Sequence, residues 1–539
     1  MDQPERTSHL GTSNGNRLTQ VTRSSAPGAS RWRRAHPSCG STDIQDRRTR
    51  IGLVANDRKR VLGVASENVV RVTDRWIGEA SGIELADAIR SGRTTSRRVV
   101  AFHIGTLLVR AGDGAIARDR FAAALEEADH VDAGPSTTAA DRPLAGVPCT
   151  VKESIPVAGM PHTAGLASRA GVVAESDALV VRRLRNAGAI IVGVTNTSEM
   201  CLGIESTNSV YGRTSNPYDH RRVSGGSSGG EGSAIGGGGS PFGVGGDTGG
   251  SIRIPSFYCG IFGHKPSPGL VPATEQIPSV SRTGELSSLE TLGPMTRRAS
   301  DLMPLLRILA DDDGTRCKPI ESVDMNGLRV VIPTGSTYLR SMDRSVREAR
   351  DAAGTALAEL GADVQWRPMP AIRRLMSSYL AELRRHAGSP VTALFDSFDV
   401  SGAAHRTPAW LRASSLQLRL AMVGDHLLGS APRMLGRRLD SIASDLADEV
   451  AEVVGDGVMM HPPLPRPAPL HNATLGRPWL FGGAALFNLL GMTATEVPLG
   501  LNERGLPVGV QVAAAAGKDH VTIAVATALE SHFGGWVSP

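Results

Sequence analysis

Several serines lie in or beside one glycine-rich stretch of this chain, where hydroxyl nucleophiles would stand close to accessible backbone N–H groups. The stretch runs from residue 225 to residue 250, 14 of its 26 residues are glycine, and it contains Ser227 and Ser228. Ser251 follows immediately. Each glycine weakens a regular helix or strand, but it also allows the backbone to approach a ligand closely. The pattern therefore predicts a binding loop, for which three chemistries can be compared.

Two of these chemistries fit the residues poorly. A phosphate-binding P-loop needs a lysine after its glycines, and no lysine lies between Arg222 and Lys265. Residues 243–249 also miss the spacing of a dinucleotide-binding loop. Residues 226–230 match the G-x-S-x-G turn of α/β-hydrolases with Ser228 as nucleophile, but no apolar strand precedes them. The third chemistry is that of a serine hydrolase whose base is a lysine.

Three blocks in this order and spacing resemble the amidase signature family. They are residues 146–154 (GVPCTVKES), 225–231 (GGSSGGE) and 245–255 (GGDTGGSIRIP), with further matches at 195–196, 215–218 and 259–266. The similarity extends from about residue 80 to the C-terminus. Within the family, the fatty-acid amide hydrolase branch is the most similar, on Glu231 and on residues 262–269, 497–502 and 533–536.

The resemblance implies a Ser-Ser-Lys triad that needs no metal and no organic cofactor. In this triad Ser251 is the acyl-forming nucleophile, Ser227 the bridging serine, held by a cis peptide bond, and Lys152 the base. The remaining implied site residues are the oxyanion-hole N–H groups of Thr248, Gly249, Gly250 and Ser251, the substrate-lining Cys201, and the supporting side chains Ser228, Asp247 and Arg253. By contrast, His162, His264 and His426 match no acid–serine arrangement and are expected to be structural or surface residues.

A lysine can act as a base only while its amine is uncharged. At the ordinary lysine pKa of about 10.4, the neutral amine lies about 4.6 kcal/mol uphill at pH 7. Burial without a carboxylate partner lowers a lysine pKa enough to offset most of that cost, and Lys152 follows an apolar run that suits burial. The neighbouring Glu153 is expected to point to the opposite face of the same strand.

Alternating strand and helix patterns surround these blocks and predict an α/β fold. Helices are expected at residues 81–90, 96–109, 117–128 and 345–360, and a helix followed by a buried strand at 177–194. Strands are expected at 328–333 and 362–366. This alternation favours a largely parallel sheet, whereas the family resemblance implies a single domain built on a large, twisted, mixed sheet flanked by helices.

Residues 370–460 are expected to be helical and to form part of the substrate pocket or a lid over it. Within them, residues 410–439 combine an apolar helix face with several arginines. An ordinary core-facing helix pair, a lid and a weak peripheral membrane contact all remain open for this segment.

Composition places the charge of the chain in a tail. Of 539 residues, the first 60 carry 12 Lys and Arg against 5 Asp and Glu, so the remainder is nearly neutral. Residues 1–75 are therefore expected to be a basic, disordered tail and residues 76–539 the amidase signature domain. No nucleic-acid partner is expected, and a homodimer is left open. Five cysteines without metal spacing and the lack of an 18-residue apolar run predict a cytoplasmic protein with no transmembrane segment.

The function expected from the site and the resemblance is that of an amidase. It would hydrolyse a carboxylic amide, with an apolar or fatty acyl group suggested by the branch, to an acid and an amine or ammonia through an acyl-serine intermediate. One alternative is the glutamine-hydrolysing A-type subunit of a tRNA amidotransferase, and a second is an inactive binding protein of the same fold.

Overall fold

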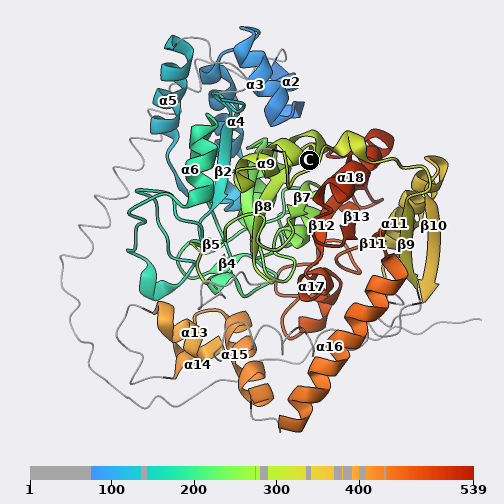
Figure 1. The fold of residues 1–539 in the computed structure, drawn as a ribbon. Coiled ribbons are helices and arrows are strands. Elements are labelled where there is room, and N and C mark those ends of the chain that lie inside the picture. The colour runs from blue at the N-terminus through green and yellow to red at the C-terminus, as the bar shows by residue number, and fades with distance from the viewer. Residues whose placement is uncertain are drawn as a thin grey trace, which may run out of the picture. The chain divides into compact units, whose positions relative to one another are not determined.

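An 11-stranded mixed β-sheet forms the centre of the computed structural model (Figure 1). The structure describes residues 74–134, 142–273, 275–279, 289–312, 314–334, 341–368, 379, 391–399, 408–429 and 433–539. The strands occur in the sheet in the order β1-β3-β2-β6-β8-β7-β12-β13-β11-β9-β10, and β4 and β5 form a separate pair. Their bounds are β1 Ile116–Asp119, β2 Pro148–Lys152, β3 Ile190–Thr195, β4 Thr207–Asn208, β5 Gly212–Arg213, β6 Phe242–Asp247, β7 Phe262–Lys265, β8 Thr291–Thr296, β9 Arg329–Thr334, β10 Asp363–Pro368, β11 Val458–His461, β12 Thr493–Leu501 and β13 Pro507–Ala514.

Helices cover both faces of this sheet. Helices α6, α9, α11 and α18 lie on one face, while α7, α8, α16 and α17 lie on the other. The helix bounds are α2 Arg75–Glu79, α3 Gly82–Arg90, α4 Ser96–Val109, α5 Phe121–Ala133, α6 Leu179–Asn186, α7 Gly229–Gly236, α8 Arg253–Cys259, α9 Leu302–Ala310, α11 Arg344–Glu359, α13 Val391–Phe398, α14 Ala409–Arg412, α15 Leu416–Gly429, α16 Arg433–Val454, α17 Gly482–Leu489 and α18 Asp519–Phe533.

The expectation of a largely parallel sheet is wrong, and the mixed sheet implied by the family is confirmed. Among the described strands, parallel pairs occur only among β3, β2 and β6 and among β11, β9 and β10. A connection between parallel strands needs a crossover, which is usually a helix. The parallel pairs therefore include the strands for which the sequence showed a helix pattern in between. The strands between them pair antiparallel, and β12 and β13 are joined directly by a short turn.

Most expected elements are present within a residue or two, because their apolar spacing and caps are local signals. Helix α3 begins with a reciprocal capping box between Ser81 and Glu84. The expected helix at 117–128 is wrong at its start, since residues 116–119 form β1 and α5 begins at Phe121. Tertiary pairing of β1 with β3 overrides the helical pattern there.

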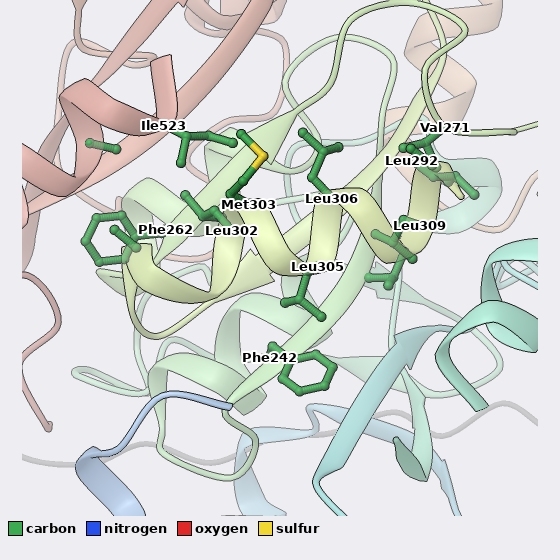
Figure 2. Close-up of a cluster of buried hydrophobic side chains, with 14 of the residues drawn as sticks. Phe242, Phe262, Val271, Leu292, Leu302, Met303, Leu305, Leu306, Leu309 and Ile523 are labelled. Carbon is green, nitrogen blue, oxygen red and sulfur yellow. The ribbon is translucent and has the colours of Figure 1, made fainter. Parts of the chain in front are cut away.

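The largest hydrophobic core fills the space between the sheet and the α9/α18 face. Figure 2 shows Leu302, Met303, Leu306 and Leu309 of α9 among side chains of the sheet and α18. Leu305 points toward Phe242 of β6 (Figure 2). This packing holds β6 from the face opposite α7, so the glycine-rich strand has a rigid backing.

Residues 391–398, 409–412, 416–429 and 433–454 form helices, as expected, whereas residues 458–461 form strand β11. Apart from Tyr379 and residues 391–399, the 369–407 stretch lies outside the described residues, as does the 1–73 part of the expected tail. One face of α14 and α15 packs on α13 and on Met200. The carboxylate of Glu199 accepts hydrogen bonds from the N–H groups of Ser414 and Ser415, which fastens the start of α15 beside Met200.

The outer face of the same two helices is apolar. It carries Trp410, Leu411, Leu416, Leu420 and Val423, each 43–53% exposed. Among the described residues, no helix is long and apolar enough to cross a bilayer.

Candidate active site

Strand β2 delivers Lys152 to the sheet face that α7 covers. Lys152 is 1% exposed, and its Nζ donates a 2.7 Å hydrogen bond to Oγ of Ser227, which immediately precedes Ser228, the N-cap of α7. In the sheet Lys152 pairs with Thr195 of β3. The expected base and the expected bridging serine are therefore in direct contact inside the protein.

Glu153 lies in the turn that follows β2, so the strand on whose alternation its direction was expected ends at Lys152. Its carboxylate accepts hydrogen bonds from the N–H of Thr163, the N–H of Ala164 and the hydroxyl of Tyr211, at 2.6, 2.9 and 2.7 Å. Burial raises the pKa of Glu153, although these hydrogen bonds lower it. The acid that follows the lysine in sequence thus has its own hydrogen-bond partners in Thr163, Ala164 and Tyr211.

The backbone of Ser227 is held from its carbonyl side. The Gly226–Ser227 peptide bond is cis, and the Ser227 carbonyl accepts hydrogen bonds from the hydroxyls of Thr197 and Ser206, both at 2.9 Å. Cys201 Sγ lies 3.5 Å from the same Thr197 hydroxyl. Cys201 is therefore one residue removed from the bridging serine, in a half-buried position next to the candidate site.

Ser251 lies in the turn between β6 and α8. Its carbonyl accepts a 3.3 Å hydrogen bond from the N–H of Ser228, so its backbone lies beside the serine pair. Ser228 Oγ donates to the carbonyl of Gly246 at 3.3 Å. Among the described residues, Ser251 Oγ has no hydrogen-bond partner. Ser227 thus contacts Lys152 directly, but no hydrogen bond joins Ser227 Oγ to Ser251 Oγ among these residues.

The N–H groups expected to form an oxyanion hole do not all have the same surroundings. The N–H of Gly250 donates to Oδ1 of Asp247 at 2.7 Å. In the described part of the chain, the backbone N–H groups of Thr248, Gly249 and Ser251 have no hydrogen-bond acceptor. This arrangement differs from the expectation, because Gly250 already has a partner and three donors remain.

A buried charged pair supports the loop. Asp247 and Arg253 are fully buried and 3.0 Å apart, and the five N–H donors of the guanidinium are all used, on Asp247, the Asn488 and Gln511 side chains and the Ala484 carbonyl. Although burial raises the pKa of Asp247, the charge of Arg253 lowers it to about 2. The expected supporting residues Asp247 and Arg253 therefore connect the loop that carries Ser251 to α17 and β13.

Residues 109–523 match the family described as Amidase. The chain belongs to the amidase family. Fatty-acid amide hydrolase 2-B of Danio rerio is 40% identical over 484 residues, which cover 85% of this chain and 90% of the relative. The A-type subunit of the glutamyl-tRNA(Gln) amidotransferase of Deinococcus radiodurans is 32% identical over 483 residues, covering 83% and 96%. A crystal structure of an amidase matches with a TM-score of 0.71 and 28% identity over 84% of this chain and 100% of that one.

These comparisons confirm the family resemblance seen in the sequence and the amidase signature fold. The protein is an amide-bond hydrolase of this family. Among the residues that the structure describes, no three or more His, Cys, Asp and Glu side chains gather as they would around a metal ion.

Two supporting residues of this amidase were missed in the sequence. Asn488 donates to Asp247 at 2.9 Å and accepts from Arg253 at 2.6 Å, and Gln511 accepts from Arg253 at 2.6 Å. Each is a lone amide in an otherwise apolar run. Buried amides need partners, so this isolation is the signal that would have indicated them.

The sequence analysis also missed an apolar wall beside the loop of the amidase that carries Ser251. The Tyr379 hydroxyl donates to the Thr248 carbonyl at 3.0 Å, and the Tyr379 ring packs edge-on against Phe481. Gly250 has a φ of +110°, and a Cβ added to it would lie 2.4 Å from that of Ala484. Tyr379 comes from the 370–460 section expected to line the pocket, whereas Phe481 and Ala484 come from beyond it.

His264 has an acid partner that the sequence analysis did not anticipate. Its Nε2 lies 3.1 Å from Oδ1 of Asp519, and its Nδ1 lies 2.8 Å from Thr495 Oγ1. Ser267 donates to Asp519 and not to His264. The group is buried and joins β7, β12 and α18, so the structural role expected for His264 fits.

Proposed function

We propose that this amidase hydrolyses small carboxylic amides through an acyl-serine intermediate formed on Ser251, with Ser227 as the bridge and Lys152 as the base. The observation that supports it most directly is the 2.7 Å hydrogen bond from the buried Lys152 amine to the Ser227 hydroxyl. A serine hydroxyl is a weak nucleophile until a base accepts its proton, and this pair supplies a base with a relay.

In the acylation step, the Ser227 hydroxyl passes its proton to the uncharged Lys152 amine and receives the proton of Ser251. Ser251 Oγ forms a bond to the amide carbon, and the carbonyl oxygen becomes an oxyanion that the N–H groups of Thr248, Gly249 and Ser251 stabilise. The carbon–nitrogen bond then breaks as Lys152 returns its proton through Ser227 to the leaving nitrogen. Water, activated by the same relay, attacks the acyl-serine and releases the acid.

A fluorophosphonate probe tests the nucleophile. The purified full-length chain is expected to form one covalent adduct, which peptide mass mapping places on Ser251. Ser251→Ala should form none, while Ser228→Ala, a matched change at the serine next to the bridge, should still be labelled on Ser251. Absence of an adduct in the unmodified protein would favour the inactive binding protein, and an adduct on Ser228 would favour the α/β-hydrolase type of turn.

The acyl group of the substrate is proposed to be apolar. Tyr379, Phe481 and Ala484 border Gly249 and Gly250, and Tyr379 and Phe481 pack with Leu289 and Ala485 in one hydrophobic cluster. An acyl chain bound to Ser251 beside these side chains would bury its methylene groups, at about 0.8 kcal/mol for each group.

A series of primary amides graded by acyl length tests this proposal. We expect kcat/KM to rise by about threefold or more per added methylene until the wall is filled. A flat or falling series would contradict an apolar acyl site. Hydrolysis of these amides by the purified chain without a partner would also argue against an amidotransferase subunit, whose relative here is the less similar at 32% identity.

Several other expectations from the sequence remain predictions. A cytoplasmic location, the division into a tail at 1–75 and a domain at 76–539, and a homodimer belong to this group. So does a weak peripheral membrane contact, for which the apolar outer face of α14 and α15 is the available surface.

A further inference from the structure

A second buried acid lies on the same sheet face as the proposed base. Glu231, in the first turn of α7, is 0% exposed. Its Oε2 accepts from the Thr150 hydroxyl at 2.6 Å, and its Oε1 accepts from the Thr195 hydroxyl at 2.8 Å. Thr150 precedes Lys152 by two residues on β2, and Thr195 on β3 is the strand partner of Lys152. The carboxyl is therefore held against the two residues that flank Lys152 in the sheet.

The neighbouring strand is built to admit this carboxyl. Thr150 pairs with Gly243 on β6, and a Cβ added to Gly243 would lie 2.0 Å from Oε2 of Glu231. Any side chain there would displace the acid from Thr150. The glycine thus has a role that the flexibility of a binding loop does not explain, because residue 243 lies within a regular strand.

The surroundings of the carboxyl favour its neutral form. A carboxylate offers about four acceptor sites, and only two hydroxyls reach this one. Among the described residues, no cation lies within ion-pair distance of it. The titratable groups that act on it are Lys152, on the same face, and the Cys149 thiol, on the opposite face of β2. Burial raises the pKa of Glu231 to about 8, although the two hydroxyls and the charge of Lys152 lower it.

The ionisation of this acid bears directly on the base. A carboxylate buried at this place would stabilise the ammonium form of Lys152, and an ammonium group cannot accept a proton from Ser227. A neutral carboxyl has no such effect, since it can donate one hydrogen bond and accept another between the same two hydroxyls. We propose that Glu231 is a positioning residue, carried as the neutral acid between Thr150 and Thr195, so that no buried carboxylate draws a proton onto the Lys152 amine.

This inference rests on the proposed role of Lys152, but its first test needs no turnover. The infrared difference spectrum of the unmodified protein minus Glu231→Gln should show a protonated-carboxyl band at pH 7, which disappears as the pH rises through about 8. Absence of this band at pH 7 would overturn the proposal. Glu153→Gln, a matched change at a buried acid in the turn after β2, should leave the band in place.

Coupling to the base is tested by Lys152→Met and by the pH profile. Because an uncharged amine exerts no pull on the carboxylate, Lys152→Met should leave the pH at which the band disappears unchanged, and a move to higher pH would show a charged lysine and overturn the proposal. In kcat/KM, the acid limb of Glu231→Gln should coincide with that of the unmodified enzyme. A limb displaced by more than one pH unit toward acid would show that the carboxyl is ionised and paired with an ammonium.

A third variant covers failure of the lysine variant to fold. Gly243→Ala forces the carboxyl away from Thr150, so the band should shift in frequency and its pH midpoint should change, whereas an unchanged band would contradict the assigned geometry. The fluorophosphonate adduct on Ser251 is scored separately. A missing adduct with the band present counts against the proposed function, and an adduct without the band counts against the role of Glu231.

Discussion

Replacement of Lys152 by alanine is expected to lower kcat for amide hydrolysis by about two to four orders of magnitude. The change removes the buried amine that donates 2.7 Å to the Ser227 hydroxyl, and with it both the acceptor of the serine proton and the donor to the leaving nitrogen. The remaining activity should depend on hydroxide, so the pH optimum should rise. Steady-state kinetics from pH 6 to about pH 10 measure both effects.

A suitable control is Lys518→Ala. Lys518 is 29% exposed in its side chain and pairs with Asp456 far from β2 in sequence, so kcat and its pH dependence should not change. An unaltered pH–rate profile in Lys152→Ala, with the fold intact by circular dichroism, would remove Lys152 from the mechanism. In Lys152→Ala, fluorophosphonate labelling is expected to be lost together with turnover, because the probe also needs an activated Ser251.

Replacement of Arg253 by methionine is expected to destabilise the fold by about 3–5 kcal/mol, because it leaves the Asp247 carboxylate buried without its cation. Both side chains have no exposed surface, and Asp247 also accepts the N–H of Gly250 and an amide N–H of Asn488. Loss of the guanidinium should therefore loosen the nucleophile loop and lower kcat together with the thermal midpoint. Urea denaturation and kinetics on the same samples measure the two effects.

The pH dependence of this loss has a definite sign. With Arg253 present, the pKa of Asp247 is held at about 2, below its unfolded value, so the pair stabilises the fold above about pH 4 and this contribution is lost as the pH falls through 2. In Arg253→Met, the strongest influence that lowers the pKa of the carboxyl is gone while burial still raises it, so the penalty should grow as the pH rises above 4. Arg75→Met, at an exposed pair with Glu79, should show neither effect. A loss that does not depend on pH would contradict the ion-pair explanation.

Local signals account for much of what could be predicted. Capping residues, apolar spacing and glycine stops placed α3, α4, α6 and α11 because those interactions lie within one or two helical turns. The base and the bridging serine were also predicted, since three motif blocks occur in the order and spacing of a known family.

Errors appeared where long-range contacts decide the outcome. The mixed sheet depends on which strands meet, and β12 and β13 enter its middle from the end of the chain (Figure 1). Residues 116–119 became a strand because β3 was available to pair with them. The N–H of Gly250 turned toward Asp247, which no spacing rule for the loop would reveal.

By itself, the sequence determined the family and the amide chemistry and pointed to the candidate lysine and serines, because these depend on residue types and order along the chain. Only the tertiary structure decided which groups surround them: Asn488 and Gln511 on Arg253, Tyr379 on the loop, and Glu231 between two threonines. The physical reason is that burial and hydrogen-bond partners set the charge of a group, and the partners just named lie from tens to hundreds of positions away in the sequence.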